Sequence, residues 1–247
     1  MNAAVVLISI TLAACRAGIG QDKLSAHANA PVLLFNGAGA SPADVAAIER
    51  ILWSEQLAYS TANSPQLNGM SESRIREYRL LIVPGGNFEQ IGKSLTATTT
   101  GQIRAAVRDG LNYLGICAGA FFGGNSPYNG LNLTAGTRFG FYSAEARGIR
   151  KQAVAITFPG NRTLDQYWED GPQLTGWGAV IARYPDGTPA AVEGTFGSGW
   201  VMLAGVHAEA PASWRRGMDF RTSAETNIAY AAKLIRAALN REWLPHY

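Results

Sequence analysis

Short apolar runs alternate with amphipathic stretches through the first half of the chain. The runs lie at residues 31–35, 79–83 and 111–116, and their length and largely apolar character are typical of strands buried on both faces of a parallel sheet. Between them, apolar residues recur at helical spacing over 42–57 and 102–109. Strands and helices that alternate in this order predict parallel strands joined by right-handed crossovers. The first half is therefore expected to form an α/β sheet.

The second half of the chain, from Gly130 onward, has a different pattern. Short segments of β-forming residues are separated by turn signals such as Pro185-Asp186-Gly187, as in successive strands joined by tight turns. A capping box, Thr222-Ser223-Ala224-Glu225, then opens a final helix whose apolar face runs to Leu239. No internal repeat divides the chain, so residues 31–247 are predicted to form one domain. The predicted strands are 138–142, 153–158, 164–168, 179–183, 190–196 and 200–206.

Composition narrows the classes of function. Apolar residues make up 47% of the 247 residues and charged residues 16%, which is typical of a globular chain. The formal net charge is only +3, and no basic block is interleaved with aromatic residues. We therefore expect no nucleic-acid partner.

The first fifteen residues resemble a bacterial lipoprotein signal. Residues 3–14 are apolar or small and uncharged; a membrane-spanning helix needs about 20 residues, so this segment instead suits the apolar region of an export signal. Leu12-Ala13-Ala14-Cys15 resembles the lipobox, in which the cysteine is acylated and becomes the new N-terminus. Residues 1–14 are thus predicted to be a signal peptide and 15–30 a lipid-anchored tether. The alternative is a first buried strand or helix.

A lipid on Cys15 would anchor the protein to a membrane of the bacterial cell envelope, facing the periplasm. Arg16, rather than aspartate, follows the cysteine, which favours the outer membrane in a Gram-negative host. The chain holds only two cysteines. With Cys15 acylated, Cys117 is a thiol without a disulfide partner in an oxidising compartment, which favours a functional reason for it.

Cys117 lies in the stretch Gly115-Ile116-Cys117-Ala118-Gly119, between a predicted strand and small residues that can open a helix. A residue at such a corner is pushed out above the sheet edge, and glycines two positions away let strand, helix and turn approach closely. The first N–H groups of the helix favour the thiolate, which is the nucleophilic form of cysteine. The alternative is a buried structural cysteine in a glycine-rich turn.

Two further motifs end predicted strands at the same sheet edge. Pro84-Gly85-Gly86-Asn87 follows the second strand, and N–H groups of Gly85 and Gly86, with that of Ala118, could form an oxyanion hole. His207-Ala208-Glu209 follows the last strand. Residues two apart in an extended segment share a face, so Glu209 could hold the Nδ1 proton of His207 while Nε2 faces a nucleophile. A lone His-x-Glu is also compatible with a purely structural histidine.

These residues carry a resemblance to the class I glutamine amidotransferases. The stretches 110–122, 140–142 and 168–172 are more closely similar to the biotin-protein ligase N-terminal domain family. The resemblance implies a three-layer α/β/α, flavodoxin-like fold with a mostly parallel central sheet and added β segments. It also implies that Cys117 is the nucleophile, His207 the base and Glu209 the residue that orients the imidazole. The implied oxyanion donors are Gly85, Gly86 and Ala118.

The leading hypothesis is an exported, lipid-anchored cysteine hydrolase that acts on an amide or related acyl bond of a small-molecule or peptide-like substrate. Asn87, Tyr167 and Trp168 are predicted to line the substrate pocket, and we expect neither a cofactor nor a metal. The alternative is a non-catalytic module that binds a small ligand at the same edge. A third hypothesis is stress chemistry of Cys117 on aldehydes or oxidants, as in the related intracellular protease superfamily.

Overall fold

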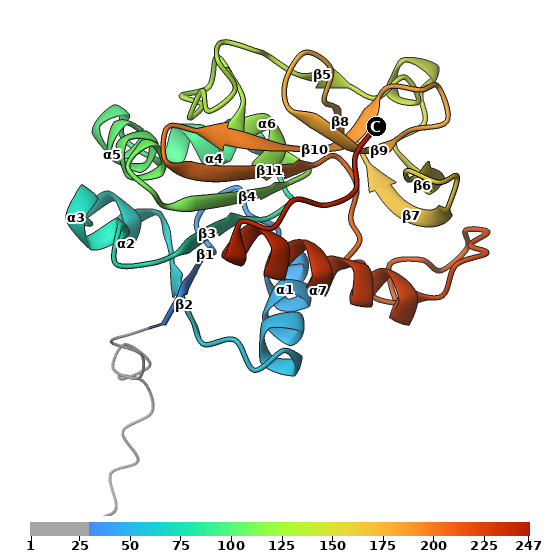
Figure 1. Ribbon diagram of the computed structural model, residues 1–247, viewed down its shortest axis with the longest axis horizontal. Coiled ribbons are helices and arrows are strands. Elements are labelled where there is room, and N and C mark those ends of the chain that lie inside the picture. Colours follow the sequence, from blue (N-terminus) through green and yellow to red (C-terminus); the bar gives the residue numbers. More distant parts are fainter. Residues whose placement is uncertain (1–29) are drawn as a thin grey trace, which may run out of the picture.

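The computed structural model describes residues 30–247, and the predicted signal peptide, almost all of the tether and Cys15 lie outside these residues. The described chain folds around one nine-stranded sheet, in the order β2-β1-β3-β4-β11-β10-β9-β6-β7 (Figure 1). The first five strands of this order are parallel: β2 (Tyr59–Ala62), β1 (Val32–Phe35), β3 (Leu80–Val83), β4 (Asn112–Ile116) and β11 (Gly199–Ala204). The other four extend the sheet with antiparallel pairing: β10 (Pro189–Phe196), β9 (Ala179–Arg183), β6 (Lys151–Thr157) and β7 (Thr163–Glu169).

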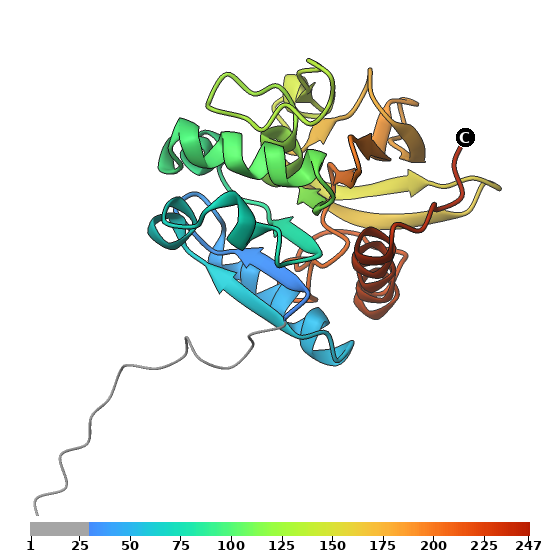
Figure 2. The same cartoon turned by 60° about the vertical axis from the view of Figure 1, so that its left-hand side comes forward.

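Helices cover both faces of the sheet, which gives three layers (Figures 1 and 2). One face carries α1 (Pro42–Ser54) and α7 (Ala224–Asn240). The opposite face carries α2 (Ser64–Asn68), α3 (Glu72–Ile75), α4 (Phe88–Ser94), α5 (Ala97–Arg108) and α6 (Ala118–Gly123). A short antiparallel pair, β5 (Gly140–Phe141) with β8 (Pro172–Gln173), and a 3₁₀ turn at Glu145–Arg147 complete the elements. The predicted three-layer α/β/α class is confirmed.

The alternation of side chains along β1 shows how the two cores arise. Val32 and Leu34 pack into the core under α1 and α7, whereas Leu33 and Phe35 pack into the core on the other face. All four are at most 1% exposed. A strand buried on both faces is therefore apolar at every position, as the sequence pattern indicated.

Several boundaries differ from the sequence-based expectation for local reasons. Helix α5 begins five residues before the predicted start at 102, because the Thr96 hydroxyl caps it by accepting from Thr99 N–H at 3.0 Å. At the start of α7 the cap is Ser223, while the Thr222 hydroxyl accepts from the N–H of Asp165 at 2.9 Å. Strand β2 and the helices α2 to α4 were not predicted at all.

No helix within residues 30–247 is both long enough and apolar enough to cross a membrane. The feature that positions the site is the register of the parallel strands. Val83 of β3 lies beside Gly115 of β4, and Ile116 of β4 lies beside Ala204 of β11. These three strands therefore end at one edge of the sheet, and the segments that follow them meet there.

Candidate active site

Cys117 stands at the corner between β4 and α6. Its φ of 49° and ψ of −104° are unusual for a residue with a side chain and indicate a tight strand-to-helix turn. The flanking glycines leave no room for a Cβ, since one on Gly115 would clash with the Gly119 carbonyl, and one on Gly119 with that of Val83. The Cys117 N–H donates to the Ala204 carbonyl at 2.7 Å, which ties the corner to β11. The expected close approach of strand, turn and helix is present.

The Cys117 side chain is 5% exposed. Its Sγ lies 3.4 Å from the Glu169 carbonyl oxygen, and it forms no disulfide with any described residue. The thiol therefore lies just beneath the surface at the end of β7.

His207 is held by two carboxylates, of which only one was expected. Its Nδ1 lies 2.8 Å from Glu209 Oε1, as the His-x-Glu spacing predicted, and 3.0 Å from Asp44 Oδ1. All three side chains are at most 7% exposed. The single Nδ1 proton is directed to Glu209, and Asp44 Oδ1 has no well-aligned hydrogen-bond donor in the described chain. Asp44 thus acts on the imidazole chiefly through its charge.

Asp44 was not predicted from the sequence as a partner of His207. Asp44 lies in the first turn of α1, where the dipole favours an acid, and its N–H donates to the Ser41 hydroxyl at 3.3 Å. Because this position at the start of a helix explains an acidic residue by itself, the local sequence offered no reason to pair His207 with Asp44. Its place just after the carboxyl end of β1, on the same edge as the strand before Cys117, was the available signal.

The charges around His207 favour its protonated form. Burial alone lowers the pKa of the imidazole, but negative charge at Cys117, followed by that at Glu209 and Asp44, raises that pKa well above its ordinary value. Burial raises the pKa of Glu209 despite His207. For Asp44, burial also acts to raise the pKa, yet the attraction of His207 prevails and lowers it. Asp44 is therefore the more acidic of the two carboxyl groups beside His207.

Asp44, His207 and Glu209 could also be considered as metal ligands, because one ligand atom from each lies within 4.8 Å of the others. The Nδ1···O separations of 2.8 and 3.0 Å are those of hydrogen-bonded or charge-paired groups. In the structure these contacts are a hydrogen bond between His207 and Glu209 and a charge pair between His207 and Asp44.

The proposed oxyanion donors have free backbone N–H groups. In residues 30–247, the N–H groups of Gly85, Gly86 and Ala118 donate to no backbone carbonyl, whereas that of Cys117 is already used. Gly85 also packs directly on the site, because a Cβ there would lie 2.5 Å from His207 Cε1 and would collide with Asp44. Its lack of a side chain thus makes room for the imidazole.

The three predicted pocket residues lie in different surroundings. Tyr167 borders the site, with its ring 5.7 Å from the His207 ring and its hydroxyl donating to the Glu169 carboxylate at 2.5 Å. Asn87 is exposed and caps α4 by accepting from Gln90 N–H at 3.0 Å. Trp168 is fully buried, and its Nε1 donates to the Gly171 carbonyl. Its expected place in a pocket is therefore wrong, since strand alternation turns it into the core beside Tyr142.

Trp214 is a further neighbour of the site that the sequence did not reveal. Its ring lies 5.9 Å from that of His207 and 5.7 Å from that of Tyr167. Tyr167 of β7 and Trp214 of the loop before α7 therefore both lie beside the imidazole of His207.

Comparison with known proteins identifies the family. The profile described as biotin-protein ligase, N terminal, matches residues 30–152. An uncharacterized protein of Chlamydia muridarum is 30% identical over 195 residues, which cover 68% of this chain and 72% of that protein. The chain belongs to the biotin-protein ligase N-terminal family. The region matched by the family profile includes Cys117 and the Gly85-Gly86 pair and ends before His207.

Solved structures place this member of the biotin-protein ligase N-terminal family on the class I glutamine amidotransferase-like fold. A glutamine amidotransferase aligns with a TM-score of 0.57 and 19% identity, over 72% of this chain and 90% of that one. A glutamine amidotransferase from Thermotoga maritima aligns with a TM-score of 0.52 and 16% identity, over 87% and 99% of the two chains. At these identities the likeness concerns the fold.

Proposed function

We propose that the protein is a cysteine hydrolase that acts on an amide or related acyl bond. Its glutamine amidotransferase-like fold is compatible with amidotransferase-like chemistry. The observation that carries the finer proposal is the meeting, at one sheet edge, of a cysteine on a strained corner and a histidine backed by buried carboxylates.

The proposed reaction uses the atoms at this edge. The Cys117 thiolate attacks the acyl carbon, and the oxygen that becomes negative accepts from the free N–H groups of Gly85, Gly86 and Ala118. Protonated His207 gives its Nε2 proton to the leaving amine, and a thioester remains on Sγ. His207 then takes a proton from water, whose oxygen attacks the thioester carbon. The carboxylic acid leaves, and Sγ leaves as the thiolate beside a protonated His207, ready for the next cycle.

The location of the protein belongs to the same proposal. Export followed by acylation of Cys15, expected from the resemblance to a lipobox, would keep the enzyme on a membrane of the cell envelope and present it to a small-molecule or peptide-like substrate.

A substrate screen over acyl amides and esters, glutamine included, tests the chemistry. Cys117→Ala should abolish turnover and the acyl adduct seen by mass spectrometry of the intact protein. His207→Ala should lower kcat by roughly 10²–10⁴-fold, the usual contribution of a general acid–base. His246→Ala is the matched control, because among the described residues that imidazole lies beside the Leu244 carbonyl and the Trp243 ring near the C-terminal end of the chain. It should leave turnover unchanged.

Three outcomes would contradict the proposal. Equal turnover by Cys117→Ala would mean that this thiol is not the nucleophile. Loss of turnover with EDTA would favour a metal at Asp44, His207 and Glu209. If no compound is turned over, but a ligand binds wild type and Cys117→Ala equally, the non-catalytic binding module would be the better description.

A further inference from the structure

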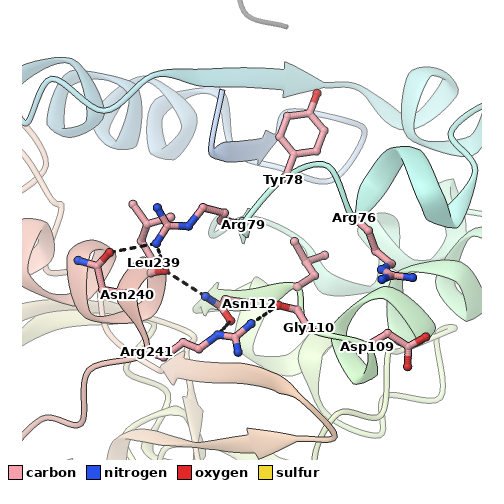
Figure 3. A pocket seen from close by; sticks show the side chains of 10 residues that line it. Arg76, Tyr78, Arg79, Asp109, Gly110, Asn112, Leu239, Asn240 and Arg241 are labelled. Carbon is pink, nitrogen blue, oxygen red and sulfur yellow. Dashed lines mark hydrogen bonds between the residues drawn. The ribbon is translucent and has the colours of Figure 1, made fainter. Parts of the chain in front are cut away.

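A cavity of about 430 Å³ lies at the opposite edge of the sheet from Cys117 (Figure 3). It is bounded by the segments that lead into β3 and β4 and by the end of α7. We call it the arginine pocket, because three arginines of two segments line it: Arg76 and Arg79 before β3, and Arg241 after α7.

The charge of the arginine pocket is positive. The acidic residue in its lining is Asp109, whose carboxylate is held by Arg108 at 2.8 Å, outside the pocket lining. Arg76 has a distant ionic partner, with Nη1 3.6 Å from Glu72 Oε1. The three lining arginines therefore outweigh the lining acid.

Two of the guanidinium groups are held in place from behind. Arg241 Nε donates to Asn112 Oδ1 at 2.9 Å, and its Nη2 donates to the Gly110 carbonyl. Arg79 uses only Nη2, towards the Leu239 carbonyl and Asn240 Oδ1. Figure 3 shows these bonds running from the arginines to the walls. Within residues 30–247, Nε and Nη1 of Arg79 and Nη1 of Arg241 have no hydrogen-bond acceptor.

Helix capping explains part of this arrangement. Arg79 satisfies a terminal carbonyl of α7, and cations at a helix C-terminus are favourable. Capping does not account for Arg76, which touches no part of α7 in the contacts described, or for the cavity between the three groups. Arginine N–H groups pair with phosphate oxygens through charge-assisted hydrogen bonds, and the unused N–H groups of Arg79 and Arg241 are available for such contacts.

We propose that the arginine pocket binds a phosphate group, either free or carried on a larger molecule such as a lipid. The Arg79 N–H donates to the Pro31 carbonyl at 2.8 Å, so the chain enters the fold beside this pocket. If Cys15 carries a lipid, the pocket lies on the edge from which the tether leaves, within reach of lipid headgroups.

Calorimetric titration of the full chain with inorganic phosphate, against chloride at equal ionic strength, tests the proposal. Arg76→Gln/Arg79→Gln should weaken phosphate binding by about tenfold or more, as expected from the loss of charge-assisted hydrogen bonds. The matched control, Arg74→Gln/Arg221→Gln, removes the same charge from exposed sites outside the pocket and should bind like wild type. If the first variant is unfolded by circular dichroism, Arg76→Gln alone replaces it, because within residues 30–247 the ion pair of Arg76 is a surface contact with Glu72 at 3.6 Å.

The source of the phosphate is distinguished by a vesicle arm, carried out in the Cys15→Ser background. Vesicles of phosphatidylcholine are compared with equal mixtures of phosphatidylcholine and phosphatidic acid. Binding that needs phosphatidic acid and the pocket arginines identifies a lipid phosphate, and binding to inorganic phosphate alone identifies a soluble one. Equal behaviour of the pocket variant and its control in both arms, or no binding in either, would overturn the proposal.

Discussion

Two carboxylates around one imidazole nitrogen are more than a single orienting acid requires. Glu209 accepts the Nδ1 proton, and Asp44 adds a second negative charge at 3.0 Å. Removing one carboxylate leaves the other in place to support the imidazolium. The site therefore has a built-in redundancy that a Cys-His-Glu arrangement alone would lack.

Asp44→Asn should lower the pKa of His207, because it removes one of the charges that raise it. The fall in the pKa is measured from the imidazole resonances of His207 by NMR. The protonated form would then be lost at a lower pH, and the alkaline limit of turnover should move down with it. Glu209→Gln should have an effect of the same sign.

The double variant is the sharper test of this redundancy. Asp44→Asn/Glu209→Gln should lower kcat by more than the product of the two single effects, because no carboxylate then remains at Nδ1. A pKa of His207 that is the same in Asp44→Asn and wild type would show that Asp44 serves only to start α1.

At the level of elements, the loop between β3 and α4 leaves room for the imidazole of His207, because Gly85 in this loop has no side chain. A Cβ on Gly85 would meet His207 Cε1 and Asp44, so Gly85→Ala should displace the imidazole from its carboxylates. We expect turnover to fall at least as far as in His207→Ala, and the free energy of unfolding to drop by about 1–3 kcal/mol from overpacking. Urea unfolding and the turnover assay measure the two effects.

Gly101→Ala provides the control for Gly85→Ala. Gly101 lies inside α5, and nothing stands within 4 Å of its missing Cβ. Alanine there should raise the free energy of unfolding by roughly 0.5–1 kcal/mol, because glycine is unfavourable in a helix, with turnover unchanged. Gly85→Ala with wild-type turnover would mean that the His207 ring does not need this space.

Elements with a strong local signal were predictable from the sequence. The buried strands β1 and β3 are apolar throughout, β4 is apolar after Asn112, and the corner at Cys117 is marked by its two glycines. Elements that depend on tertiary contacts were missed. The edge strand β2 is partly exposed and follows no apolar run. Helix α4 is capped by Asn87, a residue that the sequence pattern assigned to the end of the preceding strand.

The same division applies to the candidate site. His207 and Glu209 are two residues apart, so their pairing follows from local geometry. The contact of Asp44 with His207 joins the start of α1 to the segment after β11, and no local pattern encodes it. The prediction that Trp168 lines the pocket failed for a related reason. Its neighbours Tyr167 and Glu169 point to the site, whereas its own ring turns to the core.

At the scale of the molecule, the two edges of the parallel sheet have different surroundings. Cys117 follows the carboxyl end of β4, whereas Pro31 precedes β1 and lies beside Arg79 at the amino-terminal edge. A lipid attached through the segment before Pro31 would therefore hold the protein by the edge opposite the candidate active site. Such an arrangement would leave that site open to substrates away from the membrane.

Acylation of Cys15 is the step on which this orientation depends. In cells given a labelled fatty acid, the wild-type chain should take up label and sediment with membranes, and Cys15→Ser should do neither, because it lacks the thiol to be acylated. Cys117→Ser is the matched control: it removes the only other cysteine, which is buried beneath the sheet edge, and should remain labelled. A wild-type chain without label, or label that disappears only with Cys117, would mean that Leu12-Ala13-Ala14-Cys15 is not a lipidation signal, and the proposed orientation would lose its basis.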